Sequence, residues 1–268
     1  MDKQTLRKVQ LILLEMLKDI DSVCKRHKIQ YFLDSGTLIG AVRHRGFIPW
    51  DDDLDIGMLR ADYEKFSSIA QAELGEKYFW QTWDTDPDYP IPFGKVRKRG
   101  TKYVESKSKE LKENGFFIDI LPYDYAPNSV EKCERIRNRQ WLLYRMLLMK
   151  DGYKPWYETN EVNLKKRIGY IPFSIVSKLV TKRMIISQYM KTINCVEEKT
   201  LVYQQTGKKY YKASWMQNTV TLEFEGEQFP VVDHYHEWLT KAYGDYMTPP
   251  PPHERENRHQ IYKLDFGE

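Results

Sequence analysis

Four aspartates lie within five positions of the chain, between Trp50 and Ile56. A short strand is expected here, and its alternation would place Asp53 and Asp55 on one face and Leu54 and Ile56 on the other. Two adjacent carboxylates repel each other and raise each other's pKa unless a cation lies between them. Because magnesium takes one or two carboxylates together with substrate phosphates, we predict a magnesium site here, which manganese could also occupy.

A third carboxylate, Asp119, stands alone in the apolar run Phe116–Leu121. An acid in a buried strand is costly unless it is paired or bound to metal. A neighbouring strand could bring Asp119 beside Asp53 and Asp55. We therefore predict a cluster of three carboxylates.

Three other interpretations of the acidic run were considered. A calcium-binding EF-hand loop that starts at Asp51 would place Ile56 at position six and Asp62 at position twelve, so it is excluded. A short Asp-x-Asp motif that holds manganese and a nucleotide sugar, as in glycosyltransferases, stays open. An acidic loop that caps a helix starting near Arg60 is the structural alternative.

The elements that must position these residues follow from periodicity and from breaks at glycine and proline. The expected helices are 3–28, 37–43, 60–74, 171–190 and 232–243, with a strongly apolar helical stretch at 141–149. The expected strands are 31–33, 53–58, 78–83, 93–98 and 116–121. The sequence thus predicts a mixed α/β part to about residue 125, a helical part to about residue 200, and a C-terminal return.

Composition excludes several classes of protein. The 268 residues are 41% hydrophobic and 14% aromatic, which argues against a disordered chain. The sequence has no apolar run of about 18 residues for a spanning helix and no visible secretory signal, so a cytoplasmic location is expected. Cys24, Cys133 and Cys195 are odd in number and far apart, as expected in a reducing compartment.

The charge is unevenly distributed along the chain. Residues 132–191 contain 14 lysines and arginines and four acidic residues, a net charge of +10, so the remainder carries −6 of the total +4. A basic region of this kind suggests a face that meets an anionic ligand or surface, although a solvated basic face is equally compatible. No motif that reads DNA or RNA is recognisable, so a nucleic-acid partner is not expected.

The run from Gly36 to Ile56, GTLIGAVRHRGFIPWDDDLDI, resembles the signature of the LicD family of phosphotransferases. That family is related to fukutin and the fukutin-related protein and has a nucleotidyltransferase fold. Residues 116–122 resemble the strand that carries the family's third carboxylate. The segment from Tyr243 through the prolines to Arg255 and His259 resembles its C-terminal motif.

The resemblance implies an α/β (α+β) fold, with a nucleotidyltransferase-like mixed sheet, flanking helices and a mainly helical region. The expected parts are a catalytic core at 1–125, a basic helical region at 126–200 and a C-terminal return at 201–268. Asp53 and Asp55 would bind magnesium, and Asp119 would complete the cluster. Gly36 and Thr37 match a turn whose backbone amides can face a phosphate.

The implied reaction is magnesium-dependent transfer of phosphocholine from CDP-choline, or a related CDP-linked donor, to a hydroxyl of a lipid-linked glycan. Teichoic acid and lipopolysaccharide precursors are the expected acceptors, and ethanolamine, glycerol or ribitol could replace choline. Asp119 is the candidate acceptor of the hydroxyl proton. Guanidinium and ammonium groups suit phosphate oxygens, and the candidates are Arg43, Arg45, Lys95 and Arg97. Arg255 and His259 could close over the site.

Two rival functions and one membrane hypothesis remain at this stage. The same aspartates could serve a glycosyltransferase that uses a nucleotide sugar, or the scaffold could bind nucleotides or glycans without catalysis. Residues 141–149 could rest on the inner leaflet of an anionic membrane, or they could face the core with a basic outer side. The flanking basic residues are Arg135, Arg137, Arg139, Arg145 and Lys150.

Overall fold

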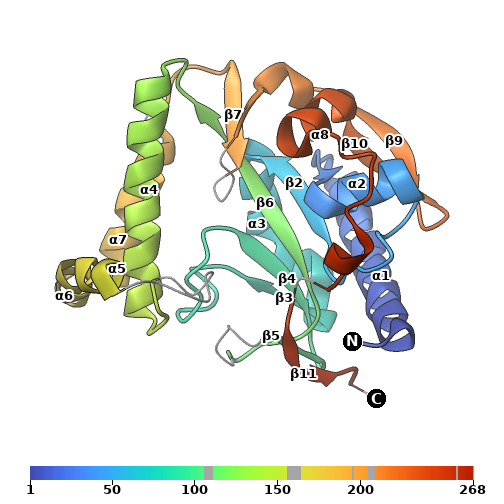
Figure 1. Cartoon of the computed structure of the whole chain (residues 1–268), viewed down its shortest axis with the longest axis horizontal. Helices are drawn as coiled ribbons and strands as arrows, with labels where there is room; N and C mark the ends of the chain where they lie inside the picture. The colour runs from blue at the N-terminus through green and yellow to red at the C-terminus, as the bar shows by residue number, and fades with distance from the viewer. Residues whose placement is uncertain (106–110, 156–163, 195, 205–208, 258, 268) are drawn as a thin grey trace. The chain divides into compact units, whose positions relative to one another are not determined.

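A computed structural model describes residues 1–105, 111–155, 164–194, 196–204, 209–257 and 259–267. The chain divides into two compact units. Unit 1 comprises residues 1–81, 93–124 and 202–268, and unit 2 comprises residues 82–92 and 125–201. The helices and strands are labelled in Figure 1.

A mixed sheet is the centre of unit 1, with the strand order β1-β2-β6-β4-β3. β2 and β6 run parallel, while β1 pairs antiparallel with β2, and β4 pairs antiparallel with β6 and β3. β7 joins the sheet through β6 and pairs with β8. The strands are β1 (Phe32–Leu33), β2 (Asp55–Leu59), β3 (Tyr78–Gln81), β4 (Gly94–Lys98), β6 (Phe117–Ala126), β7 (Leu201–Gln204) and β8 (Tyr210–Lys212). The expected mixed α/β fold is confirmed.

Helices cover this sheet because their apolar faces match its buried strands. In α1 (Lys3–His27), Val9, Leu13 and Leu17 are buried at helical spacing, and the Asp2 carboxylate caps the first turn by accepting from the Gln4 and Thr5 amides. The main core contains α1 residues together with Phe66 and with Ile56 of β2. The other helices of unit 1 are α2 (Ser35–His44), α3 (Arg60–Leu74) and α8 (Tyr235–Tyr243).

Two further strand pairs and three short 3-10 turns complete unit 1. β9 (Thr219–Phe224) and β10 (Glu227–Val232) form an antiparallel hairpin, and β11 (Ile261–Asp265) pairs antiparallel with β5 (Lys102–Glu105). The 3-10 turns are η1 (Gly75–Lys77), η2 (Ala213–Met216) and η3 (Pro252–Glu254). None of these elements is among those expected from the sequence.

Unit 2 contains the helices α4 (Val130–Lys150), α5 (Leu164–Gly169), α6 (Ile171–Leu179) and α7 (Lys182–Asn194). Its core joins α4 to α7, where Tyr144 and Leu148 pack with Tyr189 and Ile193. Figure 1 shows α4 and α7 side by side. None of the described helices has the length and apolarity needed to span a bilayer.

Several element boundaries differ from those expected. The strand expected at 53–58 begins at Asp55, and the one expected at 116–121 continues to Ala126. The helix expected at 171–190 is interrupted, because the Thr181 hydroxyl accepts from the Met184 amide and caps a new helix. The last helix begins at Tyr235, because residues up to Val232 pair with β9. Cys24 and Cys133 are free and buried, and Cys195 lies outside the described residues.

Candidate active site

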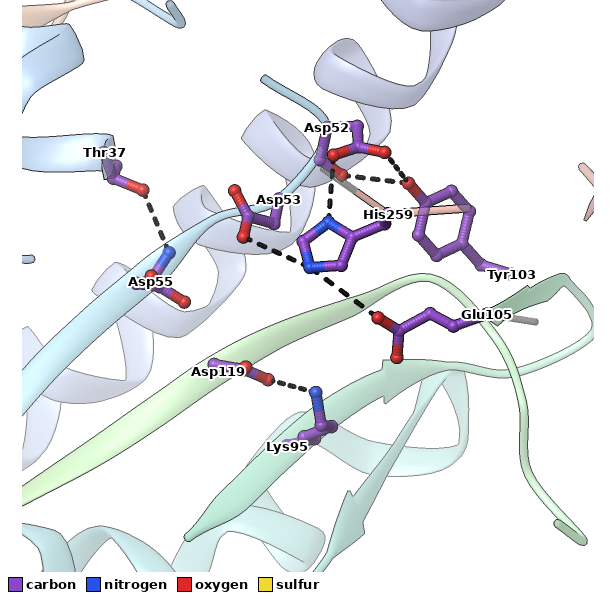
Figure 2. A network of polar contacts seen from close by, with 9 residues as sticks. All are labelled: Thr37, Asp52, Asp53, Asp55, Lys95, Tyr103, Glu105, Asp119 and His259. Carbon is purple, nitrogen blue, oxygen red and sulfur yellow. Dashed lines mark hydrogen bonds and ion pairs between the residues drawn. The ribbon is translucent and has the colours of Figure 1, made fainter. Parts of the chain in front are cut away.

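Strand register brings Asp55 next to Asp119. The two residues are direct partners in the parallel pairing of β2 with β6, so their side chains leave the same face of the sheet. Lys95 of β4 is the antiparallel partner of Asp119, and its Nζ lies 2.7 Å from Asp119 Oδ1. The predicted approach of Asp119 to the first acidic pair is confirmed, and Lys95 adds a cation to it (Figure 2).

Asp53 lies just before β2 rather than on it, because the strand pairing of β2 starts at Asp55, two residues later. The Asp34 amide donates to the Asp55 carbonyl over 3.1 Å, and the Asp55 amide donates to Thr37 Oγ1 over 2.9 Å. Asp53 nevertheless contributes to the site, since its negative charge is among the causes that raise the pKa of Asp55 and of Asp119. The three predicted carboxylates therefore form one electrostatic cluster.

The turn that starts α2 supports this cluster from the side of β1. Asp34 caps the helix by accepting from the Ser35 amide over 2.7 Å, which places Gly36 and Thr37 in its first turn. A Cβ on Gly36 would lie 2.7 Å from Asp51 Oδ2, so a larger residue would displace the Asp51 carboxylate from its present position. Amides at a helix start attract anions, which agrees with the predicted phosphate contact there.

A second polar network, centred on His259, adjoins the acidic pair. The His259 Nδ1 lies 3.0 Å from Asp52 Oδ1, and the Tyr103 hydroxyl donates to Asp52 Oδ2 over 2.9 Å. The His259 Nε2 lies 3.8 Å from Asp53 Oδ2 and 3.6 Å from Glu105 Oε1. Figure 2 shows the imidazole among these three carboxylates. The pairing of β11 with β5 holds His259 here.

Electrostatics give these groups unusual proton affinities. Loss of hydration and the charges of Asp53 and Asp119 raise the pKa of Asp55 well above its usual range. Loss of hydration also raises the pKa of Asp119, and Lys95 opposes this effect. Burial would lower the pKa of His259, but its hydrogen bond to Asp52 and the charges of Asp53 and Glu105 raise it to about 9.

The donor set suits a hard divalent cation in chemistry and charge. Asp53 and Asp55 offer only oxygen, and their mutual repulsion is relieved when a cation lies between them. Among the described residues, no three histidine, cysteine, aspartate or glutamate side chains are close enough together to hold a metal by themselves. The predicted metal site of Asp53, Asp55 and Asp119 is therefore not seen as a group of three ligands in the described part of the chain, and Asp119 is paired with Lys95. Binding of magnesium by Asp53 and Asp55 with substrate phosphates stays a prediction.

Of the four basic residues predicted to contact a pyrophosphate, Lys95 is the one that the structure places at the carboxylates. Lys95 and Arg97 share a face of β4, as expected, because both lie over the Phe117 ring, at 3.5 and 4.9 Å from its centroid. Arg97 is buried and donates to Gln81 Oε1 and to the Gly115 carbonyl. These bonds link Arg97 to β3 and to the segment before β6.

The remaining arginines lie around α2 and the C-terminal segment. The Arg43 Nη1 donates to the Tyr246 carbonyl over 2.7 Å, and Arg45 is exposed and lies 4.0 Å from Glu223. The Arg255 guanidinium lies over the Trp50 ring, 5.5 Å from its centroid. Burial and the charge of Arg255 both lower the pKa of Arg43, so these two cations are within electrostatic reach of each other. Their contact with phosphate stays a prediction.

Sequence reasoning missed three members of the His259 network as site residues. Asp52 was available in the acidic run, where its position between Asp51 and Asp53 was the only signal. No sequence pattern indicated Tyr103 and Glu105. The strand β5, which contains them, is formed by hydrogen bonds to β11, and β11 lies more than 150 residues away in the chain. The structure places His259 beside Asp53, and closure of Arg255 and His259 over the site stays a prediction.

Comparison with known proteins supports the same assignment. Residues 28–155 match the family model described as LicD/FKTN/FKRP, nucleotidyltransferase domain. The chain is 34% identical to the lipopolysaccharide cholinephosphotransferase LicD of Haemophilus influenzae, over 97% of both chains. It is 35% identical to the human ribitol 5-phosphate transferase FKRP over 61 residues, which are 23% of this chain and 12% of that protein.

A relative described as uncharacterized matches nearly half of the chain. The uncharacterized protein RT0683 of Rickettsia typhi is 47% identical over 130 residues, 46% of this chain and 36% of that protein. The match to the Haemophilus protein, in contrast, extends over both units. On this full-length similarity and on the nucleotidyltransferase-like domain, the chain belongs to the LicD family and is a transferase.

Proposed function

We propose that this protein transfers phosphocholine from a CDP-linked donor such as CDP-choline to a hydroxyl of a cell-surface glycan precursor, with magnesium as cofactor. The observation that carries the proposal is the pairing of Asp55 with Asp119 beside Asp53, in a transferase of the LicD family. The choice of choline rests on the name of the full-length relative, a lipopolysaccharide cholinephosphotransferase. The acceptor would be a lipopolysaccharide or teichoic acid precursor.

Asp53 and Asp55 would hold the magnesium ion. When bound, the ion would neutralise negative charge on the diphosphate of the donor. The raised pKa of Asp55 supports this role, because a carboxylate that is costly to ionise alone gains the most from a cation. Thr37 fixes the Asp55 backbone through its hydroxyl, so the carboxylate starts from a defined position.

Asp119 is the proposed acceptor of the proton from the acceptor hydroxyl. The hydroxyl oxygen forms a bond to the phosphorus that carries choline, and the bond from that phosphorus to the bridging diphosphate oxygen breaks. CMP leaves with that electron pair, and the hydroxyl proton passes to Asp119. A carboxyl with a raised pKa holds a proton more readily near neutral pH, and Lys95 opposes this rise and so favours the ionised form that can accept the proton.

The donor diphosphate would lie near the first turn of α2. The helix start offers the amides of Gly36 and Thr37, and Arg43 and Arg255 repel each other in the absence of an anion. Arg43 lies in the last turn of α2, so the diphosphate would extend from the first turn toward these cations. Trp50 lies under Arg255.

Isothermal titration tests the donor and the metal together. Purified protein is titrated with CDP-choline, CDP-ethanolamine, CDP-glycerol, CDP-ribitol and a UDP-sugar, each with magnesium, with manganese and with EDTA. We expect CDP-choline to bind most tightly and to lose most of its affinity in EDTA and in Asp53→Asn/Asp55→Asn. The variant Asp84→Asn/Asp88→Asn removes the same charge from exposed positions and is expected to bind as wild type does.

The other outcomes are equally specific. Preference for another CDP-linked compound would keep the reaction and change the transferred group. Preference for the UDP-sugar with manganese would replace the proposal with a glycosyltransferase. Binding that is unchanged by EDTA and by Asp53→Asn/Asp55→Asn would remove the metal and both aspartates from donor binding. Release of CMP on addition of lipopolysaccharide or teichoic acid precursors then identifies the acceptor.

A further inference from the structure

Helix α6 of unit 2 exposes its apolar side chains and buries a polar one, which is the opposite of the usual arrangement. Its sequence is Ile-Pro-Phe-Ser-Ile-Val-Ser-Lys-Leu, and the one residue that it buries is Ser177. Ile175 is 57% exposed and Leu179 is 80% exposed. A helix on the surface of a globular protein normally buries its apolar stripe and exposes its polar residues. The packing of unit 2 therefore does not explain the apolar residues of α6.

Polar contacts fix α6 in this orientation. The Lys150 ammonium of α4 donates to the Ser177 carbonyl over 3.1 Å, and the Ser177 hydroxyl donates to the Ser174 carbonyl over 2.8 Å. α6 also packs against α4 along its buried side. The bond from Lys150 holds the side of α6 that carries Ser177 against α4, and the apolar residues of the helix are exposed. We define the α6 apolar surface as Ile168, Ile171, Phe173, Ile175, Val176 and Leu179.

The charged residues in the segment that contains this surface all have one sign. From Leu164 to Asn194 the sequence contains seven lysines and arginines and no aspartate or glutamate. Lys165, Lys178 and Arg183 are among them, and their side chains are exposed. Apolar residues that are bordered by basic ones are typical of helices that lie in the interface of an anionic membrane.

The same charges argue against a second copy of the chain as the partner that covers the α6 apolar surface. A symmetric dimer through the α6 apolar surface would bring two basic rims together, and like charges at an interface are repulsive. A nucleic acid would satisfy the lysines and arginines but would leave Ile175 and Leu179 without an apolar partner. An anionic bilayer satisfies both, because it offers phosphate groups and acyl chains within a few ångströms of depth.

The structure also separates α6 from the membrane hypothesis raised by residues 141–149. Most apolar residues of that stretch of α4 pack inside unit 2, where Leu147 packs with Ile185, and Leu148 packs with Tyr189. Arg145 is buried and donates to the Pro155 carbonyl. These contacts correspond to the core-facing alternative for α4, although Trp141 at its start is 48% exposed. Among the described helices of unit 2, α6 exposes the largest group of apolar residues.

We propose that the α6 apolar surface lies in the interface of a bilayer that contains anionic lipids, with Lys165, Lys178 and Arg183 at the lipid phosphates. The nine residues of α6 span roughly 14 Å as a helix, about half of the ~30 Å hydrocarbon thickness. The helix therefore lies along the surface and does not cross it. Docking of this kind would keep the enzyme where a lipid-linked acceptor is presented.

Vesicle flotation with the full chain tests this proposal without any substrate. The vesicles contain phosphatidylcholine alone or an equimolar mixture with phosphatidylglycerol, each at low and high salt. We expect wild-type protein to float with the anionic vesicles and much less with the neutral ones. The variant Phe173→Ser/Ile175→Ser/Leu179→Ser is expected to reduce anionic-vesicle binding at least about tenfold, and Lys165→Glu/Lys178→Glu/Arg183→Glu should do the same.

Matched controls distinguish this surface from apolar exposure in general. The variant Leu11→Ser/Val130→Ser/Val220→Ser changes three exposed apolar residues elsewhere and should float as wild type does. The proposal fails if wild type does not bind anionic vesicles, or if the control and the α6 variants lose binding equally. It is replaced by self-association if sedimentation shows a wild-type dimer that the serine variant converts to a monomer without any vesicle binding.

Vesicle binding and the proposed reaction can fail separately. Flotation needs neither nucleotide nor metal, and titration with CDP-choline needs no vesicle. The α6 serine variant should bind CDP-choline as wild type does and should transfer to a water-soluble acceptor at an unchanged rate. It should lose rate only when the acceptor is embedded in anionic vesicles.

Discussion

Unit 1 and unit 2 depart from the ordinary distribution of side chains in opposite directions. Unit 1 places Asp55 and Asp119, beside Asp53, where hydration is reduced, and unit 2 leaves Ile175 and Leu179 in water. A general tendency toward apolar interiors does not explain either the poorly hydrated carboxylates or the exposed apolar side chains. Each unit therefore contains an energetically unfavourable feature that its own folding does not explain.

The two costs differ in kind, and so do the ligands that would remove them. In unit 1 the cost is electrostatic repulsion and lost hydration, which a cation with substrate phosphates removes. In unit 2 it is the hydration of apolar surface, which a bilayer removes. Each unit also contains ordinary stabilising contacts, such as the Arg60–Asp124 ion pair and the packing of Leu148. These contacts provide the controls that distinguish functional residues from structural ones.

The largest expected effect is that of Asp55→Asn on transfer. Loss of a metal-binding carboxylate should lower kcat about a thousandfold or more. The same change should leave the free energy of unfolding at pH 7 in EDTA unchanged or higher, because it removes a charge that its neighbours repel. Steady-state CMP release and urea unfolding measure the two quantities. An active variant would remove Asp55 from the chemistry.

Asp124→Asn is the matched structural control in unit 1. Asp124 is fully buried and accepts from Arg60 Nε over 2.6 Å and from Arg60 Nη2 over 2.9 Å. Removing this partner leaves a buried guanidinium unpaired, which should destabilise the protein by about 3–5 kcal/mol. The protein that remains folded should retain its kcat. If Asp55→Asn and Asp124→Asn gave the same profile, the cluster would be structural rather than catalytic.

The sequence predicts the carboxylate cluster well because its signals are local. The helix expected at 60–74 has those boundaries, and a lone aspartate in an apolar strand correctly points to Asp119 as a neighbour of the acidic run. The resemblance of residues 36–56 and the C-terminal segment to one family then links the two ends of the chain. Local pattern and family signature agree in this part of the molecule.

The sequence does not predict the parts that depend on distant partners. β5 and β11 exist because each supplies the hydrogen bonds of the other, so neither alone has a strong pattern, and His259 could not be given its partners. The exposure of the apolar side of α6 could not be predicted either, because periodicity identifies an apolar stripe but does not show whether other elements cover it. For residues 171–179 the structure supplies this information, since Ser177 lies on the buried side of the helix.

Unit 2 offers a comparison of two leucines that distinguishes its core from the α6 apolar surface. Leu148 is fully buried with Tyr144, Tyr189 and Ile193, and Leu148→Ala should lower the free energy of unfolding by about 2–5 kcal/mol. Leu179→Ala removes the same atoms from an 80% exposed position and should change it by no more than about 0.5 kcal/mol. Urea unfolding monitored by circular dichroism measures both.

Equal losses in these two variants would show that Leu179 is covered in the isolated protein, which would contradict the exposure of the α6 apolar surface. Addition of anionic vesicles sharpens the comparison. They should protect wild type and Leu148→Ala alike from proteolysis in α6. Leu179→Ala should be protected less, because it has lost part of the apolar contact.

The smallest expected effect concerns a charge in unit 1 that stabilises the fold rather than serving chemistry. Glu225 accepts from Arg7 Nη2 over 2.6 Å and from the Phe47 amide over 3.1 Å, next to the segment that follows α2. Burial raises its pKa, but these two bonds outweigh burial and leave the pKa below its usual value. A carboxyl with a lowered folded-state pKa stabilises the protein above its unfolded pKa of about 4.3.

Glu225→Gln should therefore cost about 1 kcal/mol at pH 7. The difference from wild type should shrink as the pH falls below about 4 and through the folded-state pKa, because wild type then loses the same charge. Glu227→Gln on the same hairpin is the control, since its ion pair with Lys18 is exposed and should contribute little at any pH. If Glu225→Gln were less stable than wild type by the same free energy of unfolding at pH 3 as at pH 7, then shape, and not charge, would hold Phe47 in place. In that case the contrast of unit 1 with unit 2 would rest on the Arg60–Asp124 pair, the His259 network and the carboxylate cluster.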